Sequence, residues 1–218
     1  MDPANKKALL ALANDVHLRE QQWEEIARYV ELVESWNQRT NLVSRQDIGR
    51  IVSRHVRESL WFIRPEVLGE FRLVLDLGSG AGFPGVVMKI AEPGLLLTLL
   101  DSRQIKARFL AEVINHLGWD DVQAFCERAE NLPGRFPGLT FDLVVCRAVA
   151  KLSDLWRWAA PLLGPGARLA ALKGGDLAEE LHQFGKRHPA VRWQLIPMPE
   201  LPDDPAAGRH MVIVHTRI

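Results

Sequence analysis

Residues 73–85 read LVLDLGSGAGFPG. This stretch joins a short apolar run to a turn with four glycines: Gly78, Gly80, Gly82 and Gly85. Glycine loses more conformational entropy on folding than any other residue, so such a cluster needs a structural reason. The apolar run predicts a buried strand, and residues 83–91 predict the start of a helix. A glycine-rich turn between them lets a ligand approach the backbone at the carboxyl end of the strand.

The chain after Pro65 alternates short β-rich runs with helical patterns. The β-rich runs cover residues 73–77, 95–101, 121–125, 141–146, 167–173, 191–197 and 210–216. The helical patterns cover residues 85–91, 103–117, 152–163 and 176–187. This alternation predicts an α/β fold with a parallel, doubly wound sheet. The proline-rich link at 197–209 lacks helical periodicity, so the last strand is expected to pair antiparallel with the sixth.

Residues 1–64 read as helical. Apolar residues at helical spacing, including Trp23 and Trp36, form one stripe in residues 18–41, and a second helix is expected over residues 45–63. In that second helix, three arginines are expected to share one face at spacing i, i+4 and i+7: Arg50, Arg54 and Arg57. We therefore expect a helical cap over residues 1–64 packed as one unit on a sheet domain over residues 65–218.

The composition is that of an ordinary globular protein. Of the 218 residues, 47% are hydrophobic and 25% are charged, with 27 Lys and Arg against 27 Asp and Glu. This balance argues against disorder and gives no global signal for a nucleic-acid partner, although a neutral total can hide a basic face. Cys126 and Cys146 form neither a disulfide framework nor a metal-ligand spacing, so no metal is expected. No signal peptide or membrane span is visible, which predicts a soluble, cytoplasmic protein.

Two classes of ligand compete for the glycine turn. Gly80, Gly82 and Gly85 satisfy the G-x-G-x-x-G pattern of dinucleotide sites. Asp76, Gly78, Gly80 and Gly82 also satisfy the acidic-x-G-x-G-x-G pattern of S-adenosylmethionine-dependent methyltransferases. A carboxylate at Asp76 attracts an ammonium group and repels a pyrophosphate. The second pattern is therefore favoured, and with it a Rossmann-like, seven-stranded class I methyltransferase sheet whose last strand is antiparallel.

Asp101 ends the second predicted strand and is placed to accept both hydroxyls of a ribose. Ser102 follows it and also suits the N-cap of the next helix.

Eight segments in a characteristic order extend over nearly the whole chain. They are WNQRTNLVSRQD (36–47), RHVRES (54–59), VLDLGSGAGFPGV (74–86), LLDSRQIKARFL (99–110), ERAENLP (127–133), VVCRAVA (144–150), ALKGG (171–175) and GRHMVIV (208–214). Together they resemble the bacterial glucose-inhibited division protein B family of 16S ribosomal RNA (guanine-N7) methyltransferases. The resemblance implies S-adenosylmethionine as cofactor. It also implies a guanine in the 530 loop of 16S ribosomal RNA, naked or in the small ribosomal subunit, as the target.

The resemblance also implies which residues contact the cofactor. Gly78 and Phe83 would contact the cofactor directly, and Asp101 and Ser102 would lie along its ribose. Ala129 and Glu130 would lie beside the adenine, and Arg147 would close the pocket. The sequence departs from the family where Glu58 stands in place of a frequent Asp, and where Cys146 stands in place of a frequent Ser.

Guanine N7 carries a free lone pair, so its methylation needs alignment and a shielded site but no general base. We therefore assign no catalytic acid or base, and we expect Arg147 to contact either the cofactor or the guanine. Three other functions stay open. Cys146 could act as the nucleophile of a cytosine-C5 RNA methyltransferase. The chain could instead methylate a small molecule, or bind RNA without catalysis.

RNA binding requires positive surface. We expect a basic rim around the mouth of the glycine turn, made by seven residues: Arg54, Arg57, Arg103, Lys106, Lys173, Arg209 and His210. His55 and Asn41 could belong to the site or to the packing, and a buried His55 with its hydrogen bonds satisfied is the simpler expectation. We expect the protein to be a monomer.

Overall fold

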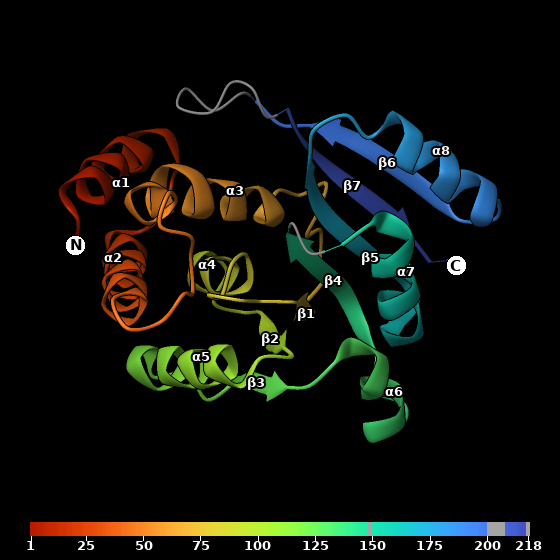
Figure 1. Cartoon of the computed structure of the whole chain (residues 1–218), viewed down its shortest axis with the longest axis horizontal. Helices are drawn as coiled ribbons and strands as arrows, with labels where there is room; N and C mark the ends of the chain where they lie inside the picture. Colours follow the sequence, from red (N-terminus) through yellow and green to blue (C-terminus); the bar gives the residue numbers. More distant parts are fainter. Residues whose placement is uncertain (148–149, 200–207, 217–218) are drawn as a thin grey trace.

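A seven-stranded sheet forms the centre of the computed structural model, which describes residues 1–147, 150–199 and 208–216. Helices cover both faces of this sheet (Figure 1). The strands are β1 (Leu73–Leu77), β2 (Leu96–Asp101), β3 (Val122–Cys126), β4 (Phe141–Arg147), β5 (Leu163–Gly174), β6 (Arg192–Pro197) and β7 (Arg209–His215). The α-helices are α1 (Pro3–Asp15), α2 (Glu20–Asn37), α3 (Arg57–Leu60), α4 (Gly85–Ala91), α5 (Gln104–Leu117), α6 (Leu132–Arg135), α7 (Leu152–Ala159) and α8 (Ala178–Arg187).

The strand order is β3-β2-β1-β4-β5-β7-β6. The pairs among β1 to β5 are parallel, whereas β7 pairs antiparallel with both β5 and β6. The predicted sheet with an antiparallel last strand is therefore confirmed. The insertion of β7 between β5 and β6 was not predicted. Most of the predicted non-helical link, residues 200–207, lies outside the described part of the chain.

Successive residues of each strand point to opposite faces of the sheet, and each face has its own core. Val74 of β1 packs in a core shared with α2, α4 and α5, whereas Leu75 packs in a core shared with α7 and α8. Ile26 and Val30 of α2 belong to the same core as Val74. We propose that residues 1–64 and 65–218 form one packed unit, because the N-terminal helices complete a core that the sheet begins.

The segment predicted as one helix over residues 45–63 is irregular. It comprises a 3₁₀ turn (Ile48–Arg50), a π-helical segment (Ile51–Val56), α3 and a second 3₁₀ turn (Trp61–Ile63). A π-helix has more residues per turn than an α-helix, so the i, i+4, i+7 spacing no longer defines one face. The expectation that Arg50, Arg54 and Arg57 lie together is therefore wrong for Arg57, whose partner is Asp15 of α1.

The two ends of α5 differ in how they are capped. The N-cap is Arg103 and not Ser102, and the Arg103 backbone N–H donates to Asp101 Oδ1 at 2.9 Å. At the other end, Gly118 takes the left-handed conformation with φ +70°, and a Cβ there would meet nothing within 4 Å. The hydrogen bond from the Arg103 N–H to Asp101 holds the start of α5 against the end of β2.

Candidate active site

The glycine turn between β1 and α4 needs glycine for conformation and for space. Gly78, Gly80 and Gly82 have φ values of 76°, 61° and 95°, which side chains disfavour. A Cβ at Gly82 would lie 2.6 Å from Val86 Cγ2, and one at Gly85 would lie 2.7 Å from Asp76 Oδ2. Gly82 and Gly85 therefore serve the packing of the turn, whereas Gly78 and Gly80 line a cavity.

Asp76 lies behind the turn and not on the cavity wall. Its side chain is fully buried, and Oδ2 accepts a hydrogen bond from the Gly85 backbone N–H at 2.9 Å. Oδ1 has no hydrogen-bond partner among the described residues. Burial raises the pKa of the Asp76 carboxyl to about 7. The structure thus places Asp76 as a support for the start of α4, and the direct ligand contact expected from the sequence stays a prediction.

The raised pKa of Asp76 predicts a pH-dependent stability. The folded protein keeps a proton on Asp76 over a range of pH in which the unfolded chain releases it, between about 4 and 7. The stabilisation is therefore complete at low pH and is lost as the pH rises toward 7. We expect Asp76→Asn to gain stability relative to wild type over this range, by up to about 4 kcal/mol. Urea unfolding of both proteins at several pH values measures this, and a pH-independent difference would contradict it.

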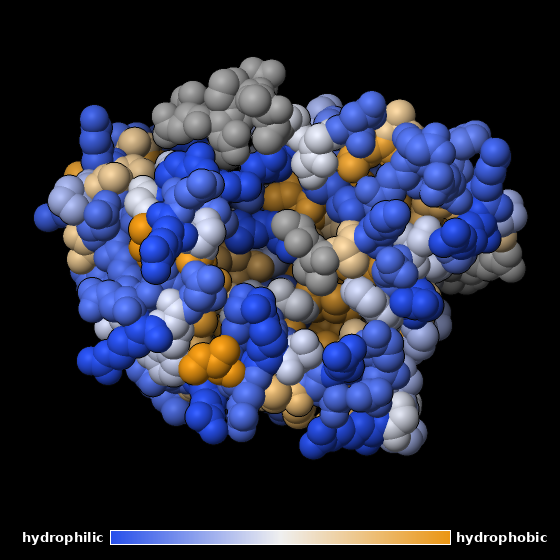
Figure 2. Space-filling view, viewed as in Figure 1, coloured by the Kyte–Doolittle hydropathy of each residue, from blue (hydrophilic) through white to orange (hydrophobic). Residues whose placement is uncertain are grey.

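Two cavities lie along the carboxyl ends of the strands. The larger, of about 440 Å³, is lined by Gly78, Gly80, Phe83, Arg147 and others from the N-terminal segment. The smaller, of about 170 Å³, is lined among others by Ala129 and Glu130. Three residues line both cavities and therefore join them: Gly78, Asp101 and Ser102. Eight of the nine cofactor residues predicted from the sequence thus line one groove, with Asp76 as the exception. Figure 2 shows a hollow near the centre of the view, and apolar residues form the floor of this hollow.

The backbone of the turn is already hydrogen-bonded within the protein. Gly78 N and Ser79 N donate to Leu100 O at 2.8 and 2.9 Å, and Gly80 N donates to Asp101 Oδ2 at 3.0 Å. Gly82 N and Gly85 N also donate to protein oxygens. A pyrophosphate needs such N–H groups free to bind it. The turn therefore fits a ligand without phosphate, and a ribose beside Asp101 stays a prediction.

Phe83 lies at the junction of three side chains in the larger cavity. The His55 ring stacks on it at 5.3 Å between centroids, and the Arg147 guanidinium lies 5.3 Å from its centroid. Tyr29 packs against it at 5.2 Å and donates a hydrogen bond to Ala81 O of the turn. Burial lowers the pKa of His55 to about 2, so this imidazole is neutral at physiological pH. His55 is buried as expected, although neither ring nitrogen has a hydrogen-bond partner among the described residues.

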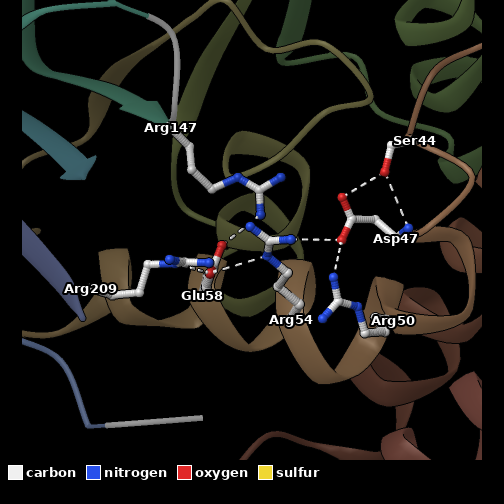
Figure 3. Close-up of polar contacts among 7 residues, drawn as sticks. All are labelled: Ser44, Asp47, Arg50, Arg54, Glu58, Arg147 and Arg209. Carbon is white, nitrogen blue, oxygen red and sulfur yellow. Dashed lines mark hydrogen bonds and ion pairs between the residues drawn. The ribbon is translucent and has the colours of Figure 1, made fainter. Parts of the chain in front are cut away.

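Glu58 holds together three elements that lie far apart in the sequence (Figure 3). Its Oε2 accepts from Arg147 of β4 at 3.0 Å, and its Oε1 accepts from Arg209 of β7 at 2.8 Å. Arg54 approaches the same carboxylate at 3.7 Å and pairs more closely with Asp47, at 2.7 Å. The Glu58 side chain is only 3% exposed. This ion-pair cluster fixes the guanidinium of Arg147 at the cavity.

The basic residues predicted to bind RNA do not form one rim. Arg103 is exposed and lines the larger cavity, whereas Lys106 lines it from a buried position. Arg54 and Arg209 belong to the Glu58 cluster. The other three line neither of the two cavities. Arg57 lines a separate cavity under α1, Lys173 pairs with Glu180 at 2.8 Å, and His210 is partly buried in β7.

Cys146 is unsuited to be a nucleophile. It is 1% exposed, packs in the core under α7 and lines neither cavity. Burial raises the pKa of its thiol, so the reactive thiolate is disfavoured. The geometry opposes the cytosine-C5 reaction that the sequence left open.

Several lining residues were not predicted from the sequence. Leu42, Val43, Ser44 and Asp47 line the larger cavity from the segment after α2, and Trp158 of α7 lines the smaller one. The segment after α2 is polar and aperiodic, so it gives no local signal that it faces the turn. The sequence has seven tryptophans, and no pattern distinguishes Trp158 from the others as a lining residue.

The parallel pairing of β1 to β5, the antiparallel β7 and a glycine turn whose N–H groups are not free for a phosphate are together the features of a class I S-adenosylmethionine-dependent methyltransferase. The residues fit this cofactor, because Gly78 leaves the backbone bare at the point where the two cavities meet. An O-methyltransferase from Streptomyces achromogenes, solved in complex with S-adenosylmethionine, shares the fold. It has a TM-score of 0.62 and 14% sequence identity, with 100% of both chains covered.

Sequence comparisons give the family. The family model GidB, described as rRNA small subunit methyltransferase G, matches residues 22–201. Ribosomal RNA small subunit methyltransferase G of Nitrosococcus oceani is 35% identical over 97% of this chain and 94% of its own length. The Shigella flexneri protein of the same description is 31% identical over 96% of this chain and 97% of its own length. The chain therefore belongs to the rRNA small subunit methyltransferase G family, and the resemblance seen in the sequence is confirmed.

Within the described residues, no helix combines the length and the apolar character needed to cross a bilayer.

Proposed function

We propose that this chain transfers a methyl group from S-adenosylmethionine to N7 of a guanine in 16S ribosomal RNA, with the 530 loop as target. We further propose that it acts as a cytoplasmic monomer, on naked RNA or on the small ribosomal subunit. The family membership supports the substrate class. One structural observation supports N7 as the acceptor, namely that no carboxylate or imidazole among the described residues lining the larger cavity is suited to be a general base.

This lack of a base follows from the partners of the ionisable side chains. The Asp47 carboxylate is paired with Arg50 and Arg54, and both oxygens of Asp101 accept backbone N–H groups. The His55 imidazole binds protons too weakly, because burial lowers its pKa to about 2. Guanine N7 attacks with its own lone pair, so such a cavity suffices. Methylation of an exocyclic amine would require a proton to be removed.

The protein contributes binding, alignment and exclusion of water. When bound, the cofactor supplies a methyl group on a sulfonium. We propose that Ala129 and Glu130 bind its adenine and that Asp101 and Ser102 bind its ribose, because all four line the groove. Leu42 and Val43 shield the larger cavity from solvent. Arg147, held by Glu58, is directed into the cavity, where its guanidinium fork suits the O6 of a guanine. A donor at N7 itself would block the nucleophile.

For RNA, we propose that Arg103 at the mouth makes a phosphate contact, with Arg54 and Arg209 supplying positive potential from inside. Lys173 and His210 lie at the ends of β5 and β7, beside this region. Arg57 contributes to RNA binding only if the RNA extends toward α1. The net charge of the chain is zero, so any attraction of RNA must come from the basic residues of this region and not from the protein as a whole.

The decisive test uses ribosomal RNA from cells that lack this protein. We expect purified wild-type enzyme with labelled S-adenosylmethionine to modify one guanine, and the site to be cleaved by chemistry specific for N7-methylguanine. We also expect Cys146→Ala to retain this activity, because the thiol lies outside both cavities. Loss of activity in a folded Cys146→Ala protein, with label on a cytosine, would favour the cytosine-C5 reaction. Cofactor binding without RNA labelling would favour a small-molecule substrate or a non-catalytic role.

A further inference from the structure

Lys106 lies inside the larger cavity and not on its rim. The side chain starts in the first turn of α5, and the residue is only 9% exposed. It lines the larger cavity next to the glycine turn, and Nζ lies 3.2 Å from the position that a Cβ on Gly80 would take. No hydrogen bond or ion pair joins its ammonium group to a residue of the described chain. The cation therefore faces the cavity without a protein partner.

The stem of Lys106 is buried while its ammonium is accessible from the cavity, so the cation is turned toward the cavity rather than toward open solvent. Burial, followed by the nearby Arg103, lowers the pKa of Lys106. Asp101 acts in the opposite direction but does not form an ion pair with Lys106. An anionic group entering the cavity would meet this unpaired cation, so the position of Lys106 is that of an anion-binding residue.

The division of the groove indicates which anion this is. With the adenine beside Ala129 and the ribose at Asp101, the rest of the cofactor, its methionine portion, extends into the larger cavity. The only anionic group of that portion is the α-carboxylate. Of the three cations that line this cavity, Arg147 is paired with Glu58 and Arg103 is exposed to solvent. A phosphodiester of a polymer would meet the exposed Arg103 before the buried Lys106.

We propose that the Lys106 ammonium binds the α-carboxylate of the methionine portion of S-adenosylmethionine. This inference rests on the cofactor site described above and assigns Lys106 to the cofactor, where the sequence suggested RNA.

The test compares two ligands that differ only in this carboxylate. Calorimetry measures the affinity of S-adenosylmethionine and of decarboxylated S-adenosylmethionine, which keeps the sulfonium and the ammonium. We expect Lys106→Met, which keeps the length of the stem, to weaken S-adenosylmethionine binding about 10- to 100-fold and to leave the decarboxylated compound unaffected. Lys106→Arg restores part of the preference. Arg108→Met removes a charge from an exposed position of the same helix and serves as the matched control.

The outcomes separate this inference from the proposed function. Failure of the wild type to bind either compound overturns the cofactor assignment itself. An equal loss for both compounds in Lys106→Met, with thermal unfolding unchanged, overturns only the role of the carboxylate. Unchanged cofactor affinity with a raised KM for ribosomal RNA overturns it too, and assigns Lys106 to a phosphate. If Lys106→Met does not fold, the same comparison with Lys106→Arg decides, because a structural role predicts no change in ligand preference.

Discussion

Gly78→Asp is expected to abolish the binding of S-adenosylmethionine, with a loss of at least about 100-fold in affinity. Gly78 lines both cavities and has a φ of 76°, so a side chain there would block the groove where its two halves meet. The new carboxylate would also stand on the same wall as Asp101, which we expect to bind the ribose. Calorimetric titration with S-adenosylmethionine measures the effect.

Gly118→Asp provides the control, because it carries the same backbone strain away from the site. Gly118 has a φ of 70° at the end of α5, and an added Cβ meets nothing within 4 Å. Both variants should lose roughly 1–2 kcal/mol of stability from the left-handed conformation. Only Gly78→Asp should lose the cofactor. Retained affinity in Gly78→Asp would remove the glycine turn from the binding site.

Glu58→Gln is expected to lower the free energy of unfolding by about 3–5 kcal/mol, which is a large fraction of the stability of a protein of this size. The Glu58 side chain is 3% exposed, and those of Arg147 and Arg209 are 14% and 11% exposed. Removing the carboxylate takes away the negative charge that both buried guanidinium groups share. Urea unfolding of wild type and variant gives the difference directly.

Glu66→Gln is the matched control for this substitution. Glu66 forms an ion pair with Arg64 at 3.4 Å, but both side chains are about half exposed, at 52% and 50%. Such surface pairs contribute little, so we expect a change below about 0.5 kcal/mol. Equal losses of unfolding free energy in the two variants would show that the buried Glu58 cluster stabilises the protein no more than a surface ion pair does.

The sequence predicted the sheet well because its signals there are local. β1 and β2 are short apolar runs. The Asp76-Leu77-Gly78 stretch marks the end of β1, and Asp101 marks the end of β2. The cofactor groove followed, because the carboxyl ends of parallel strands meet at one edge of a sheet. The resemblance to a family added Ala129 and Glu130 after β3, which no local pattern would have selected.

The features that were missed depend on contacts between distant residues. The place of β7 between β5 and β6 is a matter of long-range pairing, and the sequence of β7 alone does not encode it. Arg54 lies four residues before Glu58, so their contact is local, but the other two partners of Glu58, Arg147 and Arg209, are 89 and 151 residues away. Lys106 was expected at the surface because lysines mostly are exposed, and only the fold shows that its position faces the cavity.

The position of β7 has a consequence for how the protein matures during its synthesis. β6 pairs only with β7 within the described chain, and β7 also brings Arg209 to Glu58. While the polypeptide emerges from the ribosome, the Glu58–Arg147 ion pair can form before β7 is synthesised, but the pairing of β6 with β7 and the Glu58–Arg209 ion pair cannot. The outer edge of the sheet and the Arg209 contact of the Glu58 cluster should therefore form only after β7, which 208 residues precede, has been synthesised and inserted.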